Sequence, residues 1–188
     1  MAGPARGPAG AGREGIRGAT ENAVRMVVLG IDPGLANCGF GMVVRRGHRL
    51  LAADGGVIET SSGVPPERRL ATLHERVAAL LEEHSPDAVA LEALYFGQNV
   101  RTAFAVGQAR GAVMLAAGQR GVACVDYTPQ QVKGAVCGAG RADKDQVARM
   151  VQALLSLPEP PRPDHAADAL AVAICHANHA PLALAVAG

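Results

Sequence analysis

The sequence has few aromatic residues and little net charge. Of its 188 residues three are Phe, two are Tyr and none is Trp, and the formal charge is +1. That balance excludes a strongly basic nucleic-acid binder and an acidic solvating tail. No run of about 18 or more strongly apolar residues occurs, so we expect no transmembrane helix. Because 49% of the residues are hydrophobic, most of the chain can still form the core of one domain.

Cysteine pairs and lysine are also scarce. The four cysteines include no Cys-x-x-Cys pair, so a zinc ribbon is excluded, and small buried thiols in the reducing cytoplasm are expected. Sixteen of the 18 basic side chains are Arg, which leaves Lys133 and Lys144 as the only lysines.

Composition divides the chain into three regions. Residues 1–25 hold six Gly, two Pro, four Arg and no large apolar run, so we expect a disordered extension without a secretory signal. A folded domain is expected over 26–180, followed by a short tail over 181–188. The extension carries a net charge of +2, so residues 26–188 carry −1. A polyanionic partner must therefore be bound by local basic patches.

The apolar pattern predicts an α/β fold, because three strands are followed by alternating helices and strands and then by helices alone. The expected strands are 26–31, 39–44, 50–59, 87–92 and 121–125. The expected helices are 66–84, 100–118, 130–136, 144–157 and 165–179. Asn99 and Asp164 are expected to be the N-caps of two of these helices.

Three carboxylates stand where acidic residues are unusual. Asp32 ends the first strand in Asp-Pro-Gly, and Glu92 ends the strand over 87–92. Each has an ordinary explanation, as a turn former and as a solvated strand end. Asp168 lies in an almost wholly apolar helix, where an unpaired carboxylate costs several kcal/mol. Since ligand sites of α/β folds lie at the carboxyl ends of strands, the three could converge at one sheet edge.

Histidines near the C-terminus offer two kinds of metal ligand. His165 lies three residues before Asp168 on the same helical face, so we expect it to be a metal ligand rather than a surface residue. Asp164 is the alternative ligand at this place. Cys175, His176 and His179 could bind zinc, but a zinc site needs four ligands, so stabilisation of the histidines by the helix dipole is favoured.

Five segments in series resemble one family. They are Gly30-Ile31-Asp32-Pro33-Gly34, Leu91-Glu92, Gly107-Gln108-Ala109-Arg110-Gly111, Gln131-Val132-Lys133 and Ala166-Ala167-Asp168-Ala169-Leu170-Ala171. Together, over about 26–179, they resemble the RuvC Holliday-junction resolvases. The resemblance implies a ribonuclease H-like fold with a mixed five-stranded sheet and helices on both faces. It also implies a homodimer that cuts two opposed strands of a four-way junction in DNA recombination and repair, in partnership with the RuvA–RuvB branch-migration complex.

The resemblance also implies a catalytic set. Its expected metal ligands, for two Mg²⁺ or Mn²⁺ ions, are Asp32, Glu92, His165 and Asp168. Many family members carry Asp where His165 stands. Lys133 and Lys144 match basic positions that contact DNA and stabilise the scissile phosphate, although a solvated helix start would also explain Lys144. The other expected DNA contacts are Tyr95, Phe96, Gln98, Asn99 and Arg101, of which Phe96 could instead belong to the core.

Other interpretations remain open. The glycines of 30–34 with Gly39 and Gly41 also resemble the phosphate-binding hairpin of actin-like ATPases. A non-catalytic junction-binding module would result if His165 weakened metal binding, and a ribonuclease H-like nuclease with another substrate is a third alternative. Ala103, Gly107 and Gly111 share one helical face, which either packs on the domain's own sheet or forms a homodimer contact.

Overall fold

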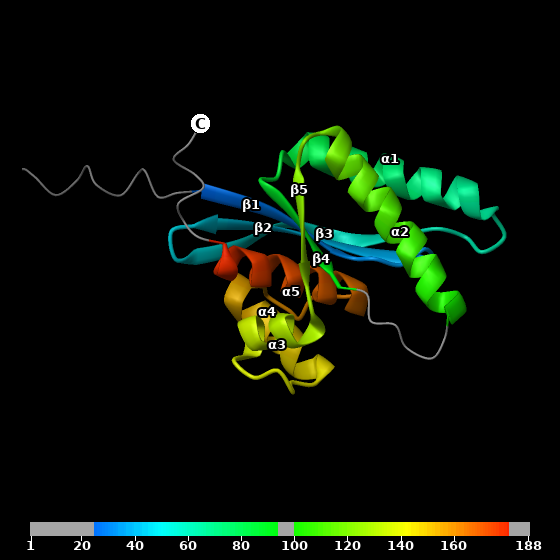
Figure 1. Ribbon diagram of the computed structural model, residues 1–188. Helices are drawn as coiled ribbons and strands as arrows, with labels where there is room; N and C mark the ends of the chain where they lie inside the picture. Colours follow the sequence, from blue (N-terminus) through cyan, green and yellow to red (C-terminus); the bar gives the residue numbers. More distant parts are fainter. Residues whose placement is uncertain (1–24, 94–99, 181–188) are drawn as a thin grey trace, which may run out of the picture.

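A five-stranded sheet with helices on both faces forms the molecule (Figure 1). The computed structural model describes residues 25–93 and 100–180. The strands are β1 (Arg25–Asp32), β2 (Asn37–Arg46), β3 (Arg49–Glu59), β4 (Ala88–Glu92) and β5 (Ala123–Tyr127). The helices are α1 (Pro66–His84), α2 (Val100–Gln119), α3 (Pro129–Cys137), α4 (Lys144–Leu155) and α5 (Asp164–His179).

The strand order is β3-β2-β1-β4-β5. β1, β2 and β3 form an antiparallel meander, whereas β4 and β5 add in parallel to the other side of β1. The central strand β1 is buried on both faces, as its continuous apolar sequence predicts. The predicted mixed sheet is thus confirmed.

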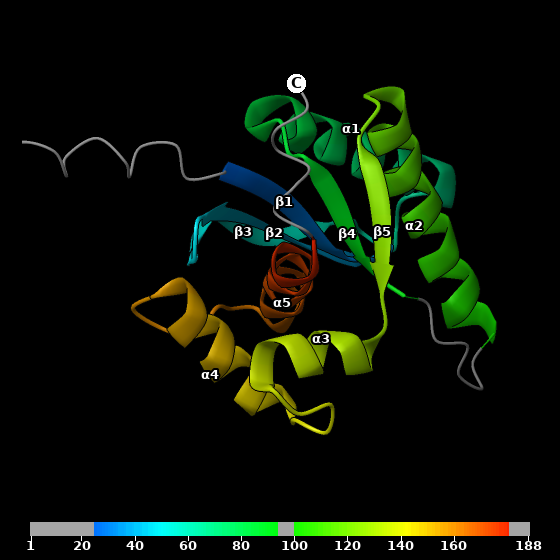
Figure 2. The ribbon, with the colours of Figure 1, turned by 60° about the vertical axis from the view of Figure 1, so that its left-hand side comes forward.

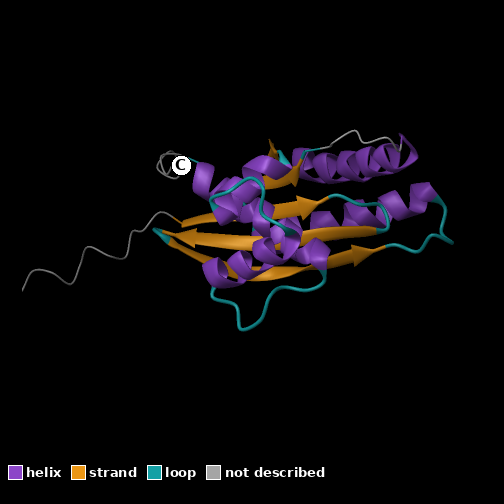
Figure 3. Cartoon of the chain, turned by 90° about the horizontal axis from the view of Figure 1, so that it is seen from below, coloured by secondary structure: helices purple, strands orange, loops and turns teal. Residues whose placement is uncertain are grey.

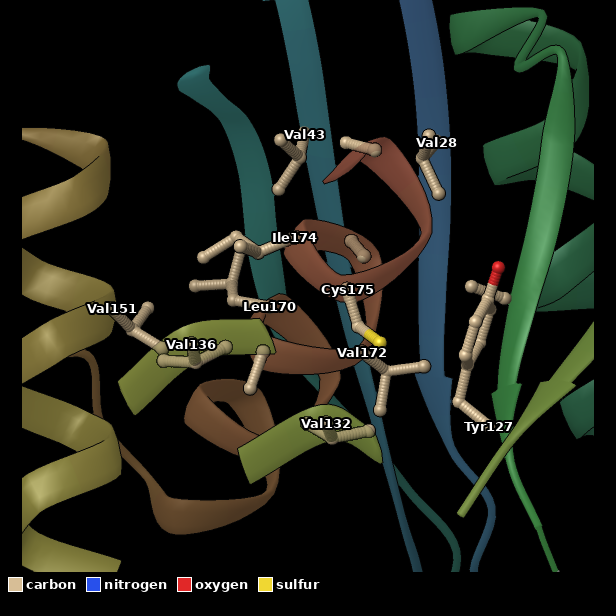
Figure 4. Packing of buried hydrophobic residues seen from close by; sticks show 14 of the residues in the cluster. Val28, Val43, Tyr127, Val132, Val136, Val151, Leu170, Val172, Ile174 and Cys175 are labelled. Carbon is tan, nitrogen blue, oxygen red and sulfur yellow. The ribbon is translucent and has the colours of Figure 1, made fainter. Parts of the chain in front are cut away.

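Two hydrophobic clusters lie on opposite faces of the sheet. α1 and α2 cover one face, and α3, α4 and α5 cover the other (Figures 2 and 3). On the α5 side, Val28 and Val43 of the sheet contact the cluster that contains Leu170 and Ile174 of α5 (Figure 4). α5 is buried from Ala169 to Ala177, so it is the central helix of this layer.

Three predicted boundaries were wrong because turns and caps override the apolar pattern. The strand predicted over 121–125 begins at Ala123, since Val122 N–H closes the end of α2 on the Ala117 carbonyl. The helix predicted over 144–157 ends at Leu155, because Ser156 adopts a left-handed conformation. Asp164 is the first residue of α5 rather than its N-cap, which is Pro163.

The predicted extension and tail fall mostly outside the described residues. Of the extension, only Arg25 is described, as the first residue of β1, and residues 181–188 are not described. No helix in the described ranges is long and apolar enough to span a membrane. The predicted cap at Asn99 also lies outside these ranges.

Candidate active site

Two parallel strands end side by side at one edge of the sheet. β1 ends at Asp32 and β4 ends at Glu92. The first turns of α5 bring His165 and Asp168 to the same edge, where all four side chains line a cleft of about 360 Å³. The full lining consists of Asp32, Glu92, Pro129, Val132, Lys133, Lys144, Val147, His165, Asp168, Ala171 and Val172. The structure therefore brings together all six residues predicted to be catalytic.

Glycines in β1 and β2 explain why α5 lies so close to the strands. A Cβ atom at Gly39 would lie 2.0 Å from the carbonyl oxygen of His165, and one at Gly30 would lie 2.0 Å from that of Ala169. Only glycine permits such an approach of two backbones. At Gly41 the space is filled by Leu170. Gly30, Gly39 and Gly41 thus accommodate a helix, so their presence does not by itself indicate a phosphate-binding hairpin.

His165 and Asp32 form the shortest polar contact described in the cleft. His165 Nδ1 lies 2.7 Å from Asp32 Oδ2. Because an ionised carboxylate only accepts hydrogen bonds, Nδ1 carries the proton and donates it to Asp32. In the neutral imidazole the lone pair is then on Nε2, which is the arrangement of a histidine that binds a metal ion while a carboxylate orients it.

Lys144 reaches from the start of α4 to Asp168. Asp143 caps this helix, and its carboxylate accepts the N–H of Gln146. Lys144 follows as the first helical residue, with 73% of its side chain exposed, and its Nζ atom lies 3.5 Å from Asp168 Oδ2. Lys144 is therefore a solvated first residue of a helix, as the alternative expects, and it also lies beside Asp168 at the cleft. Lys133 lines the same cleft from α3.

Burial and mutual repulsion perturb the acidic residues. Desolvation, followed by the charges of Asp32 and Asp168, raises the pKa of Glu92 from 4.5 to about 7, against the opposing effect of the two lysines. Desolvation also raises the pKa of Asp168, although the ammonium of Lys144 opposes this. The cleft thus holds more negative charge than its own lysines neutralise.

The donor set suits a hard divalent cation. Carboxylate oxygens are the ligands that Mg²⁺ and Mn²⁺ prefer, and a neutral imidazole is a good ligand for Mn²⁺. Within residues 25–93 and 100–180, no three His, Cys, Asp or Glu side chains already surround one point as metal ligands. Instead Asp32 pairs with His165 and Asp168 with Lys144. The four side chains therefore fit a divalent cation in the chemistry of their donor atoms and in lining the same cleft.

Comparisons with known proteins agree with this geometry. A family model described as crossover junction endodeoxyribonuclease RuvC matches residues 28–176. The chain belongs to the RuvC family. The RuvC protein of Thermomicrobium roseum is 56% identical over 151 residues, covering 80% of this chain and 92% of that protein. The RuvC protein of Moorella thermoacetica is 53% identical over 156 residues, covering 83% of this chain and 93% of that protein.

A solved structure extends the comparison to three dimensions. Thermus thermophilus RuvC in complex with Holliday junction substrate is 44% identical, with a TM-score of 0.78, and the match covers 81% of this chain and 93% of that one. These likenesses confirm the predicted RuvC family, its ribonuclease H-like α/β fold and its class of enzyme, an endonuclease that resolves four-way DNA junctions.

Several predicted DNA contacts of this RuvC chain cannot be placed. Tyr95, Phe96, Gln98 and Asn99 lie outside the described residues, as does the side chain of Arg101. Asp164, the alternative ligand to His165, is exposed and does not line the cleft.

The Cys-His-His group near the end of α5 combines a buried histidine with a helix-terminal one. His176 is 8% exposed, and its Nδ1 lies 2.9 Å from the hydroxyl of Tyr127. Cys175 Sγ lies 3.6 Å from His179 Nδ1. His176 is thus a hydrogen-bonded core residue, and its partner on β5 could not be predicted from local spacing. His179 Nδ1 lies 2.8 Å from the Cys175 carbonyl oxygen in the last turn of α5, in agreement with the favoured helix-terminal interpretation.

At Gly111 the small-residue face of α2 points away from the sheet. A Cβ atom at Gly111 would meet nothing within 4 Å, so the expected packing on the domain's own sheet was wrong there. Phe104 and Leu115 lie on the same helical face as Gly111 and are 68% and 56% exposed. The opposite face of α2 is buried through Ala109, Val113, Ala116 and Ala117. α2 is therefore apolar on both sides. For this reason its sequence alone could not show which side faces the core.

Proposed function

We propose that Asp32, Glu92, His165 and Asp168 hold two divalent ions, Mg²⁺ or Mn²⁺, with which this RuvC protein hydrolyses one phosphodiester bond in each of two opposed strands of a four-way junction. The observation that carries the assignment is the gathering of four donors in one cleft, where the pKa of Glu92 is raised to about 7. Ionisation of such a carboxyl group is costly in the free protein, but it becomes favourable beside a bound cation.

Each side chain then has a defined task. Bound divalent ions would supply an activated water and stabilise the leaving oxygen. Asp32 accepts the Nδ1 proton of His165 and so keeps Nε2 free as a donor atom. Lys133 and Lys144 present ammonium groups at the cleft, where they bind the scissile phosphate and balance its charge. Tyr95 stacks on an unpaired base, while Phe96, Gln98, Asn99 and Arg101 contact the DNA near the crossover.

Two identical chains are needed to cut two opposed strands, and α2 offers the surface for their association. The exposed apolar face of α2, which consists of Phe104, Gly111, Met114, Leu115 and Gly118, is unusual for a solvated helix. Its glycines would let a second helix approach closely. In Leu115→Glu, sedimentation should show a monomer, and a dimer of unchanged stability would contradict this role for α2.

The proposal includes the cellular setting. The protein acts in the cytoplasm on junctions that the RuvA–RuvB complex moves, because the similar proteins are bacterial enzymes of junction DNA. Copurification with RuvA on a synthetic junction tests the partnership, and junction binding that excludes RuvA would contradict it.

One experiment tests the activity and the site together. The protein is incubated with a mobile four-way junction, a static junction, a duplex and an RNA–DNA hybrid in Mg²⁺ or Mn²⁺. Paired symmetric nicks in the mobile junction are expected, and Asp168→Asn and His165→Ala should abolish them while junction binding persists. Binding without nicks by the wild-type protein would favour the non-catalytic module, and nicks in the hybrid would favour another nuclease.

A further inference from the structure

The segment Gly107-Gln108-Ala109-Arg110-Gly111 on α2 contains one charged residue, Arg110. Its side chain lies behind the sheet, on the face opposite the cleft. One terminal nitrogen of Arg110 forms an ion pair with Asp126 of β5, and the other donates to the main-chain carbonyl of Glu92 at 3.4 Å. A single guanidinium thus contacts the last residue of β4 and the penultimate residue of β5, which are adjacent strands.

Burial makes this contact different from an ordinary surface ion pair. The Arg110 side chain is only 13% exposed, whereas that of Asp126 is 52% exposed. A guanidinium buried to this extent needs hydrogen-bond acceptors, because leaving it unpaired costs several kcal/mol. A contrasting pair lies just beyond the end of α2, where Arg120 is 3.6 Å from Glu82 and both side chains are more exposed, at 32% and 81%.

The contact acts on the backbone that carries the Glu92 carboxylate. β4 ends at Glu92, where it still pairs with Tyr127 of β5, Ala93 N–H donates a 2.8 Å hydrogen bond to the Tyr127 carbonyl, and Arg110 contacts the Glu92 carbonyl. Side chains alternate along a strand, so with Leu91 buried in the α1–α2 layer, Glu92 projects to the opposite face, into the cleft. Arg110 therefore holds the Glu92 backbone from behind while the carboxylate faces the substrate side.

We infer that Arg110 is a positioning residue for Glu92, which fixes the end of β4 so that the carboxylate keeps its place as a metal ligand. This inference rests on the proposed function, in which Glu92 is such a ligand. A group that orients a metal ligand typically contributes about 10–100-fold to metal affinity or activity. The 3.4 Å contact is long, so we expect about tenfold.

The test measures Mn²⁺ affinity from the electron paramagnetic resonance signal of free Mn²⁺, in the full-length protein without DNA. Arg110→Ala should weaken binding about tenfold, and Arg110→Lys should restore part of the loss. The matched control Arg120→Ala, which removes an ion-paired arginine immediately after α2, should leave Mn²⁺ affinity unchanged. In EDTA, junction binding by Arg110→Ala should stay within about twofold of wild type, because the cleft remains assembled. Asp126→Asn provides a milder variant if Arg110→Ala does not fold.

A double-mutant cycle separates positioning from a general structural role. In a Glu92→Gln background Arg110→Ala should cause no further loss of Mn²⁺ affinity, since its effect passes through Glu92. Wild-type affinity in both Arg110→Ala and Asp126→Asn would overturn the inference, as would an equal additional loss in the Glu92→Gln background. If Glu92→Gln itself bound Mn²⁺ like wild type, the ligand assignment would fall and the inference with it. If Glu92→Gln weakened Mn²⁺ binding but the Arg110 variants did not, the inference would be overturned and the assignment of Glu92 as a ligand would stand.

Discussion

Replacing Glu92 by glutamine should stabilise the metal-free protein while it abolishes cleavage. Glu92 lies in the cleft beside two other carboxylates, and burial is the main reason that its pKa is raised from 4.5 to about 7. Ionising this side chain above pH 7 therefore opposes folding. Glutamine has nearly the same shape without the charge, so Glu92→Gln removes the cost together with the proposed metal ligand.

The magnitude follows from the pKa. A rise from 4.5 to about 7 corresponds to about 3 kcal/mol, at about 1.4 kcal/mol for each tenfold change in the ionisation constant. Glu92 is partly exposed, and solvent screening reduces this to about 1–2 kcal/mol. Because the folded state holds its proton more tightly than the unfolded chain, wild-type stability falls as the pH rises from about 4.5 to about 7.

Thermal unfolding in EDTA measures the effect. At pH 8 the Tm of Glu92→Gln should exceed that of wild type by about 3–6 °C, and the difference should shrink as the pH falls toward 4.5. The control Glu75→Gln, at an exposed position on α1, should change the Tm little at either pH. Saturating Mn²⁺ should raise the Tm of wild type more than that of Glu92→Gln. A Glu92→Gln protein no more stable than wild type at pH 8, or equally stabilised at all pH values, would refute the reasoning.

Four other outcomes are expected. At limiting metal, cleavage rates should fall as the pH drops below about 7, because protonated Glu92 cannot bind a cation; a flat profile over pH 6–8 would argue against Glu92 as a ligand. Mn²⁺ should support cleavage at least as well as Mg²⁺, since His165 adds a nitrogen donor, and a metal titration with activity only in Mg²⁺ would contradict this. Lys133→Arg and Lys144→Arg should each lower the single-turnover cleavage rate more than junction affinity, because a planar guanidinium does not replace a compact ammonium; full activity in both would show that charge alone suffices. Gly39→Ala should cost at least about 2 kcal/mol in chemical denaturation, since its Cβ would lie 2.0 Å from a backbone oxygen of α5, whereas Gly134→Ala in open space should stabilise by about 0.5–1 kcal/mol.

The sequence was most informative about the site where an acidic residue stands in an otherwise apolar element. Asp168 in an apolar helix and Glu92 at the end of an apolar strand were identifiable because a buried charge needs a partner. The convergence of Glu92 with Asp32 followed from strand direction, since parallel strands end at the same edge, and Asp168 was expected on a helix that faces this edge. The three carboxylates could therefore be located before any contact was known.

Contacts between distant elements could not be predicted in the same way. Nothing in the spacing of α2 distinguishes its buried face from the face of Gly111, because both are apolar. The partner of His176 is Tyr127, which comes from another layer of the fold. Arg110 was visible only as part of a motif, and its contact with Glu92 depends on how α2 lies across the ends of β4 and β5. Such roles arise from tertiary packing, which the local periodicity of the sequence does not predict.

The charge of the cleft explains how a chain with little net charge can act on DNA. Three carboxylates and two lysines give the cleft a formal charge of −1 with His165 neutral, equal to that of residues 26–188 as a whole. Two divalent ions, as proposed, would change the charge of the cleft to +3. The site would then attract a phosphate only when it is loaded. Both lysines of the chain line this cleft, whereas no arginine with a described side chain does, and Arg110 lies behind the sheet. The proposed ions would therefore supply the positive charge where the bond is cut, and the small net charge of the chain is compatible with a polyanionic substrate.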